Sequence, residues 1–301
     1  MHEFKILNLK TFKSALNKEI QGYLIISPLL TKEAAHLDEE LILSKIINAS
    51  YIARDLKADL LGIGGYASAI ADKKPMLCRH LKTPVTNGTS FTAWSVIEVL
   101  YRLSRIKKIN FKESTLAIIG ANSAVGSLCA RKISADFKRI IFCGRKKDKL
   151  QTLEQNIAQL TPATIKIEED ANKAIQGADI IIAANAEKEL TFDLANIKAN
   201  AFVLNASLFL ESIAKNNYRR DITVINAGVV KLPFQDVSRL NSGFPKNTVS
   251  AAMAETMLLT FEDRFYTCSL GENINLDKLE PIADLAVRHG FEIYAPQIPI
   301  L

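Results

Sequence analysis

The residues that most clearly predict chemistry lie between Ser114 and Lys149. An apolar run, Leu116 to Ile119, is followed at once by the glycine-punctuated turn GANSAVG at residues 120–126. A second run, Arg139 to Cys143, ends in Gly144 and a series of cations. Strand, tight glycine turn, helix and second strand form the opening unit of a dinucleotide-binding fold. In that unit the backbone N–H groups of the helix N-terminus approach a pyrophosphate, where the helix dipole favours negative charge.

The residues after the second strand indicate which nucleotide would bind. An NAD-selective site has Asp or Glu there to bind the ribose 2′-hydroxyl, whereas this chain has Arg145, Lys146 and Lys147. Because these cations suit a 2′-phosphate, the sequence predicts NADP(H) as the cofactor. The residues of this unit expected to bind it are Gly120, Asn122, Ser123, Ala124, Val125, Gly126, Arg145 and Lys146.

Other apolar runs predict further strands of the same sheet. The runs at 179–183, 201–204 and 222–225 fit parallel strands that are buried on both faces. Ligands of such sheets lie beyond the carboxyl ends of the strands. We therefore expect the nicotinamide half of the cofactor near residues that follow these runs, although for each residue taken alone a structural turn is the favoured interpretation. These residues are Ala184, Asn185, Asn205 and Gly228.

A polar segment ahead of the nucleotide unit predicts a second site. Residues 84–90 read PVTNGTS and precede a helix expected at 92–106. Polar segments between apolar elements often carry binding groups. The alternative is a turn whose Asn and Thr side chains satisfy the local backbone. The substrate-oxygen donors expected here are Thr86, Asn87, Thr89 and Ser90.

The last part of the chain predicts two helices. One is expected at about 248–265 and carries Glu255 as the only acid in its first two turns. This carboxylate could be solvated, pair with a base, or act as a catalytic acid or base. The other helix, 276–289, is followed by Gly290, a residue type that favours a helix C-cap.

The composition limits the class of protein. The chain has 301 residues, long enough for two domains with their own cores. Hydrophobic residues make up 48% and aromatic residues 7%, which fits an α/β protein rich in aliphatic side chains. The formal net charge of +6 favours an anionic partner, such as a phosphorylated cofactor or an acidic carrier protein. Because the basic residues are scattered among acidic ones, we expect no nucleic-acid partner.

The cysteines and the apolar runs bear on location. Cys78, Cys129, Cys143 and Cys268 show no CxxC or metal-ligand spacing, so we expect reduced thiols and no metal site. The chain begins MHEFKILNLK, which is not a signal-peptide pattern. No apolar stretch nears the roughly 20 residues of a membrane span. These features predict a cytoplasmic protein.

Three separated segments together resemble the long-chain acyl-[acyl-carrier-protein] reductases and their shikimate-dehydrogenase-like relatives. The first is LLGIGGYAS at 60–68 with PVTNGTSFTA at 84–93, and the second is GANSAVG at 120–126. The third is AMAETMLL at 252–259 with LAVRHGF at 285–291. The likeness covers roughly residues 38 to 292 and keeps the order of the segments, which makes it more specific than a lone glycine motif. It implies a Rossmann-type NADP-dependent oxidoreductase.

Two residues differ from the family pattern. Ser123 replaces the middle glycine of the turn; a residue this small still allows the approach of a phosphate and could add a hydroxyl contact. Ala252 stands where the resemblance implies an acyl-accepting cysteine, and a methyl group cannot form a thioester. Three explanations are compatible with Ala252: an engineered Cys→Ala change, a natural branch that transfers hydride without a covalent intermediate, or another nucleophilic thiol such as Cys78.

These observations together predict an α/β fold of two lobes. Residues 92–244 would form a Rossmann-type NADP-binding domain with a parallel sheet, and residues 1–91 with 245–301 a smaller α/β substrate lobe completed by C-terminal helices. The expected function is an NADP(H)-dependent oxidoreductase acting on a ketone, imine or aldehyde carbon in a cleft between the lobes. Two alternatives remain: reduction of an acyl thioester to an aldehyde, and a catalytically silent NADP(H)-binding sensor or scaffold. A homo-oligomer is compatible with each of these three functions.

Overall fold

The chain divides into two compact units in a computed structural model that describes residues 4–9, 11–27, 38–72, 74–184, 192–206, 219–234, 244–265, 270 and 275–296. The first unit comprises Met1–Phe91 and Val229–Ile293. The second unit comprises Thr92–Gly228 and Tyr294–Leu301. The chain therefore leaves the first unit, forms the second and returns.

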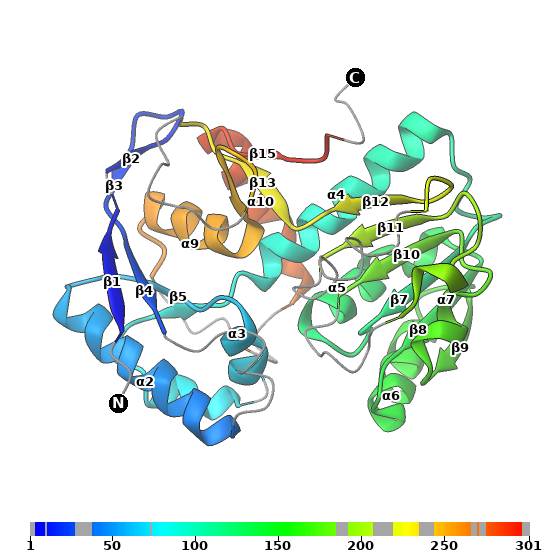
Figure 1. Cartoon of the computed structure of the whole chain (residues 1–301), viewed down its shortest axis with the longest axis horizontal. Helices are drawn as coiled ribbons and strands as arrows, with labels where there is room; N and C mark the ends of the chain where they lie inside the picture. The colour runs from blue at the N-terminus through cyan, green and yellow to red at the C-terminus, as the bar shows by residue number, and fades with distance from the viewer. Residues whose placement is uncertain are drawn as a thin grey trace. The chain divides into compact units, whose positions relative to one another are not determined.

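The second unit contains a six-stranded parallel sheet (Figure 1). Its spatial order is β12-β11-β10-β7-β8-β9, so β7, the first of these six strands along the chain, is central and the direction of winding reverses between β7 and β10. This order is that of the Rossmann fold, and it confirms the expected α/β fold class. The strands are β7 (Thr115–Ile119), β8 (Arg139–Cys143), β9 (Thr164–Glu168), β10 (Ile180–Ala183), β11 (Phe202–Asn205) and β12 (Thr223–Asn226).

Apolar side chains on both faces hold this sheet. Ala117 and Ile119 of β7 share one core cluster with Ala174 of α7 (Ala171–Ile175). Because side chains alternate along a strand, the fully buried Leu116 and Ile118 face the other side. The other helices described in this unit are α5 (Ala124–Ile133), α6 (Lys147–Ala158) and most of α4 (Thr89–Lys107), with short 3₁₀ turns at Ser134–Asp136 and Leu194–Asn196.

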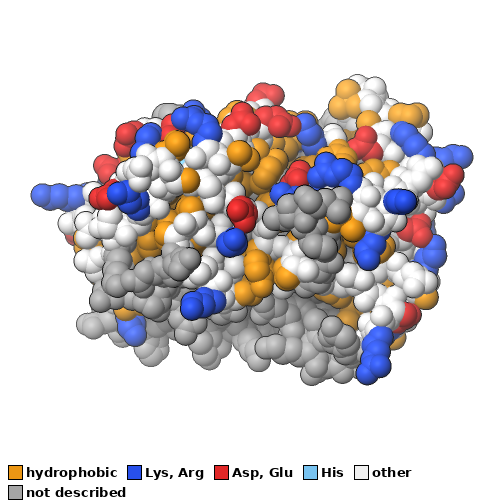
Figure 2. Space-filling model, turned by 90° about the horizontal axis from the view of Figure 1, so that it is seen from above, with side chains coloured by type: hydrophobic (Ala, Val, Ile, Leu, Met, Phe, Trp, Pro, Cys, Tyr) orange, Lys and Arg blue, Asp and Glu red, His pale blue; other side chains and the backbone are white. Residues whose placement is uncertain are grey.

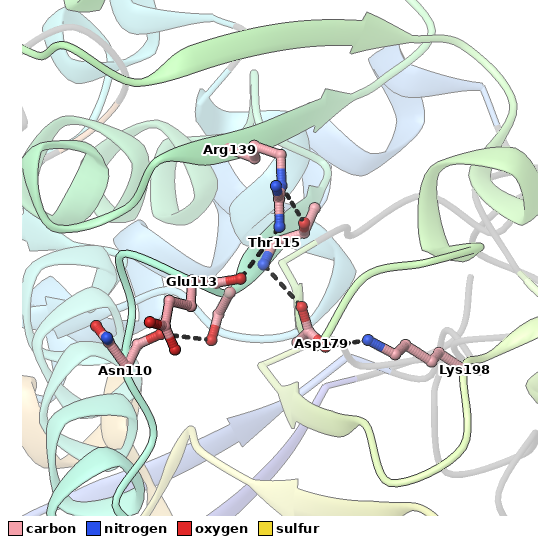
Figure 3. A network of polar contacts seen from close by, with 7 residues as sticks. Asn110, Glu113, Thr115, Arg139, Asp179 and Lys198 are labelled. Carbon is pink, nitrogen blue, oxygen red and sulfur yellow. Dashed lines mark hydrogen bonds and ion pairs between the residues drawn. The ribbon is translucent and has the colours of Figure 1, made fainter.

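A polar network fastens the amino ends of three strands (Figure 3). Asp179, before β10, accepts the backbone N–H of Thr115 at 2.9 Å and pairs with Lys198. Arg139 of β8 donates to the Thr115 hydroxyl at 3.0 Å and to the Glu113 carbonyl at 3.1 Å. Burial alone would raise the pKa of Asp179, but the bonds from Lys198 and Thr115 outweigh it and hold that pKa below its usual range. These bonds all lie at the amino ends of the strands, at the edge of the sheet opposite to the one where the glycine turn follows β7.

The first unit is built from small sheets and helices. An antiparallel pair joins β1 (Lys5–Asn8) to β4 (Tyr23–Ile26), and another joins β2 (Phe12–Lys13) to β3 (Glu19–Ile20). A parallel pair joins β5 (Leu61–Gly62) to β6 (Val85–Thr86). The helices described in this unit are α2 (Glu39–Asp55), α3 (Tyr66–Asp72), α9 (Ala251–Phe261) and α10 (Leu279–His289), with 3₁₀ turns at Pro75–Arg79 and Leu276–Lys278. Among the described helices of both units, none is long and apolar enough to cross a membrane.

A fourth sheet described in the first unit places the chain's return to this unit earlier than expected. The strand β13 (Val229–Lys231) pairs antiparallel with β14 (Thr248–Ser250) and with β15 (Glu292–Ile293). These pairings draw the segment from Val229 into the first unit, whereas the sequence placed the boundary between 244 and 245. Residues from Tyr294 onward group with the second unit instead of the first.

Two helices begin at residues other than those expected. The helix expected at 92–106 begins at Thr89, so Thr89 and Ser90 belong to its first turn rather than to a loop. The helix expected from 248 begins at Ala251, because the three residues before it pair with β13. The Ser250 side chain then accepts the N–H of Met253 at 3.2 Å and caps the helix.

The charged side chains of the molecule are mixed on its surface. On the face shown in Figure 2, Lys and Arg side chains alternate with Asp and Glu and do not gather in one patch. Pairs of opposite charge contribute to this mixture, for example Lys13 with Glu19 at 3.5 Å and Lys231 with Glu292 at 3.2 Å. Such exposed pairs add little stability.

Candidate functional site

The carboxyl ends of the parallel strands lie level with one another. In the register of the sheet, Ile119 is opposite both Cys143 and Ala183, Ala183 is opposite Asn205, and Asn205 is opposite Asn226. The segments that follow these residues therefore leave the sheet at a single edge. The edge includes the switch point between β7 and β10, which is where ligands bind in sheets of this order.

The glycine turn is held tightly at this edge. The N–H groups of Gly120 and Ala121 both donate to the carbonyl of Cys143, at 2.9 and 3.0 Å. A Cβ atom on Gly126 would lie 2.2 Å from the Gly120 carbonyl oxygen, so only glycine lets α5 start this close to the turn. Ala124 and Val125, the first two residues of α5, are partly exposed. Within the described chain their N–H groups donate to no protein acceptor, as expected for a first helical turn.

Ser123 directs its hydroxyl into the protein. Its Oγ accepts the N–H of Gly126 at 3.0 Å, which caps α5, and donates to the carbonyl of Ala184 at 2.8 Å. A hydroxyl has a single hydrogen to donate. The contact with Ala184 uses it, so in this arrangement Ser123 does not offer a phosphate the additional donor that the sequence suggested.

The basic run after β8 surrounds the start of α6. Arg145, Lys146 and Lys147 are all exposed, and Lys146 is the N-cap residue of α6 without a side-chain cap. The Asn122 side chain lies over Gly144, because a Cβ there would be 2.5 Å from Asn122 Oδ1. Cations and the positive end of a helix thus occur together beside the glycine turn.

Acidic residues at the end of β9 lie beside this basic run, and the sequence did not identify them as neighbours. Lys147 Nζ is 4.0 Å from Glu169 Oε1, and the Gly144 N–H donates to the Glu168 carbonyl at 3.3 Å. The two segments are brought together by the pairing of β8 with β9. No local pattern links them, since a helix separates the two strands in the sequence.

The other expected cofactor residues that the structure describes lie along the same edge of the sheet. Asn205 ends β11, is buried, and donates to Asn226 Oδ1 at 3.1 Å. Ala184 follows β10, and Gly228 lies two residues after the end of β12. Asn185 lies outside the described residues.

A second cluster in the first unit contains the expected catalytic positions. The Thr86 hydroxyl donates to Glu255 Oε1 at 2.6 Å and accepts the Gly88 N–H at 3.1 Å. The other oxygen of Glu255 accepts the Phe91 N–H at 2.7 Å. Burial raises the pKa of Glu255, while the bonds from Thr86 and Phe91 oppose that rise. Glu255 is therefore not solvated: it is an internal carboxylate bound at the start of α4.

Asn87 is tied to both sides of the same turn. Its Nδ2 donates to Asp72 Oδ1 at 2.6 Å, and its Oδ1 accepts the Thr89 N–H at 3.1 Å. Thr89 and Ser90 are buried in the first turn of α4. No local pattern points to Asp72, which lies 15 positions before Asn87 at the end of α3.

Ala252 lies directly against this turn. Gly88 has a φ of +70°, and a Cβ there would lie 2.1 Å from Ala252 Cα and 2.5 Å from Ala252 Cβ. Ala252 is the second residue of α9 and is partly exposed. The structure thus brings position 252 and Glu255, both in α9, next to the 86–90 segment, which is far from them in the sequence.

The cysteines of the described chain do not supply a nucleophile in place of residue 252. Cys78 is disulfide-bonded, so the expectation of a reduced thiol is wrong for this residue, as is its proposed role as a nucleophile. Cys129 and Cys143 are free and buried. Burial raises the pKa of each to about 12, with a further contribution from Glu168 and Asp170 at Cys143. At neutral pH these two thiols are protonated and are weak nucleophiles.

Comparison with known proteins supports the family resemblance. The chain is 25% identical over 303 residues to the long-chain acyl-[acyl-carrier-protein] reductase of Synechococcus elongatus, covering 96% of this chain and 87% of that protein. The chain resembles this reductase family. It is also 22% identical over 295 residues to the aminotransferase PigE of a Serratia species, covering 96% of this chain but 34% of the relative. The similarity and the strand order indicate a Rossmann-type oxidoreductase.

Other comparisons give weaker likenesses. The chain matches no protein-family model. The shikimate 5-dehydrogenase of Listeria monocytogenes, solved with shikimate and NAD, is 14% identical with a TM-score of 0.35, covering 63% of this chain and 62% of that one. The nucleotide-binding domain of glutamyl-tRNA reductase from Thermoplasma volcanium is 13% identical with a TM-score of 0.30, covering 44% of this chain and 84% of that one.

The contact of Gly88 with Ala252 predicts a difference between two glycine substitutions. Gly65 also has a positive φ, +65°, but no atom of the described residues lies within 4 Å of where its Cβ would be. Gly65→Ala should therefore cost only the backbone strain, about 1–2 kcal/mol. Gly88→Ala adds a clash with the α9 backbone and should cost about 2–5 kcal/mol in urea unfolding. Equal losses in the two variants would contradict the close approach.

The bonds of Glu255 predict that Glu255→Gln destabilises the protein. The Gln amide has one acceptor oxygen in place of two, so it can accept from the Thr86 hydroxyl or from the Phe91 N–H but not from both, and the free energy of unfolding should fall by about 1–3 kcal/mol. Glu40→Gln, at an exposed position of α2, is the matched control and should change it by less than about 0.5 kcal/mol. An unchanged stability of Glu255→Gln would show that the buried carboxylate does not hold the turn.

Proposed function

We propose that this chain is an NADP(H)-dependent oxidoreductase that transfers hydride between a nicotinamide and a carbonyl-type carbon of a ketone, imine or aldehyde. The observation that carries the proposal is the edge of the parallel sheet, where a glycine turn, the start of α5 and a basic run occur together. The 25% identity to an acyl-[acyl-carrier-protein] reductase over nearly the whole chain supports the reaction class.

The residues at this edge fit a dinucleotide with a 2′-phosphate. Among the described residues no acceptor binds the N–H groups of Ala124 and Val125, which would bind the pyrophosphate. Arg145 and Lys146 would bind the 2′-phosphate at the start of α6. Once bound, the nicotinamide supplies or accepts the hydride. The protein's part is to fix the position of the ring and to exclude competing reactions.

The first unit would bind the substrate around position 252. This position is partly exposed, small, and bordered by Gly88. Thr86 and Asn87 already have protein partners, so they would shape and stiffen the turn as well as provide oxygen contacts. Thr89 and Ser90, in the first turn of α4, are the other candidates to orient a substrate oxygen. Hydride transfer requires the nucleotide and the substrate site to meet during the reaction.

Reduction of an acyl thioester to an aldehyde is the second candidate, favoured by the named activity of the Synechococcus relative. Residue 252 lies in the first turn of α9, where the helix dipole lowers the pKa of a thiol. A cysteine there would be activated, but this chain has Ala252. With a cysteine at that position, the substrate would be an acyl group on coenzyme A or on an acidic carrier protein, which the net charge of +6 suits.

A sensor that binds NADP(H) without turnover is the third candidate, and Ala252 is the residue that favours it. Titration of NADPH fluorescence separates it from the enzymes. Binding with no turnover of aldehydes, ketones, imines or acyl thioesters would support the sensor and contradict both reactions.

The basic run predicts selective loss of NADPH binding in Arg145→Ala. Removing a charge-assisted contact with the 2′-phosphate should raise the Kd of NADPH by about tenfold or more, since such bonds are worth about 1.5–3 kcal/mol. The Kd of NADH should change by less than about twofold. Lys149→Ala, which removes an equal charge from an exposed position of α6, is the control and should leave the ratio of the two constants unchanged. Equal losses for NADPH and NADH in Arg145→Ala would contradict the assignment.

The position of residue 252 predicts that Ala252→Cys forms a covalent acyl adduct if the thioester reaction belongs to this site. Incubation with an acyl-coenzyme A and no reductant should add the mass of one acyl group, measured on the intact protein. Ala252→Ser is the matched control and should remain unmodified, because a hydroxyl at neutral pH is a far weaker nucleophile than a thiol. No adduct with any acyl-coenzyme A or acyl-carrier substrate would rule against the second candidate.

A further inference from the structure

We propose that Ser123 is a positioning residue, which fastens the carboxyl end of β10 to the glycine turn and thereby fixes where the nicotinamide half of the nucleotide lies. The inference rests on the proposed nucleotide-binding function and adds a residue that determines the geometry of the site. It concerns the family position at which a glycine is replaced by serine in this chain.

The Ser123 hydroxyl makes two bonds that a glycine cannot make. As donor it binds the Ala184 carbonyl at 2.8 Å, and as acceptor it binds the Gly126 N–H at 3.0 Å. Ser123 itself has a φ of −74° and a ψ of 164°, which any residue adopts without strain. The serine is therefore accommodated by an ordinary backbone and adds a link between two segments 61 positions apart.

Ala184 directly follows the last residue of β10, and the bond to Ser123 helps to fix its position. Its N–H donates to the Ile119 carbonyl at 2.9 Å, which extends the pairing of β10 with β7 by one residue. The described ladders of β10 with β7 and with β11 both end at Ala183, so the Ala184 carbonyl has no strand partner in them. Ser123 supplies that partner. Both polar groups of the Ala184 backbone are thus bound to the β7 end and to the turn that follows it.

The link crosses the switch point between β7 and β10. In the proposed site the adenine half of the nucleotide is bound by the glycine turn and the basic run, on the β8 side of β7. The nicotinamide half extends toward the end of β10. Ser123 belongs to the glycine turn and binds the residue after β10, so it sets the spacing between the adenine-binding contacts and the nicotinamide end of the site. Loss of the hydroxyl should therefore affect a ligand that spans both halves more than one that occupies the adenine half alone.

The test compares two ligands in three proteins. NADPH spans both halves, and adenosine 2′,5′-bisphosphate occupies the adenine half; their Kd values are measured for the wild-type chain, Ser123→Ala and Ser123→Thr. Ser123→Ala should raise the Kd of NADPH by about fivefold, the loss expected for one hydrogen bond, and that of the bisphosphate by less than about twofold. Ser123→Thr keeps the hydroxyl and should leave both constants within about twofold of wild type.

Each other outcome has a defined meaning. Equal losses of both ligands in Ser123→Ala would overturn the proposal, because the serine would then act only as a helix cap. Unchanged binding of both would overturn it as well. A wild-type chain that binds neither ligand would instead overturn the proposed function. Thermal unfolding of each variant checks folding, and Ser123→Gly, which introduces the family residue, provides the same comparison if Ser123→Ala does not fold.

Discussion

The arrangement of the nucleotide edge depends on the register of β7 with its two neighbours. Ile119 is opposite Cys143 on one side and Ala183 on the other, so the three strands end at one level. A slip of one residue would turn the buried side chains of β7 to the wrong faces. It would also move Gly120 away from the Cys143 carbonyl that both N–H groups of the turn use. The buried runs of these strands therefore position the turn as well as stabilise the sheet.

In the first unit, the buried carboxylate of Glu255 positions the polar turn. Placing Glu255 out of water is unfavourable, and its raised pKa reflects that cost. The bonds from Thr86 and Phe91 offset the cost and join α9 to the end of β6 and the start of α4. Gly88 lets the α9 backbone approach the same turn. The polar turn is thus held by a residue of α9, Glu255, which lies 169 positions after Thr86 in the sequence.

The sequence predicted the features that arise from local patterns. The strands at 116–119 and 139–143, the glycine turn and the basic run all follow from neighbouring residues, and the structure has them where expected. It did not predict the bonds of Ser123 to Ala184 or of Asn87 to Asp72, since pairs far apart in the chain leave no periodic signal. The sequence predicts helix at Thr248–Ser250, where the structure has a strand, because the pairing with β13 leaves no local signal.

The start of a helix serves different purposes in the two units, and the difference depends on what binds its N–H groups. At α4 the protein provides its own anion: Glu255 accepts the Phe91 N–H, and Asn87 accepts that of Thr89. Both groups are buried, so this helix start is a joint between elements. At α5 Ser123 binds the Gly126 N–H alone and leaves those of Ala124 and Val125, which are partly exposed. Both helix starts have the same dipole and the same kind of N–H groups. Because protein groups bind those of α4, its start is closed to an external anion, whereas the start of α5 is available to one.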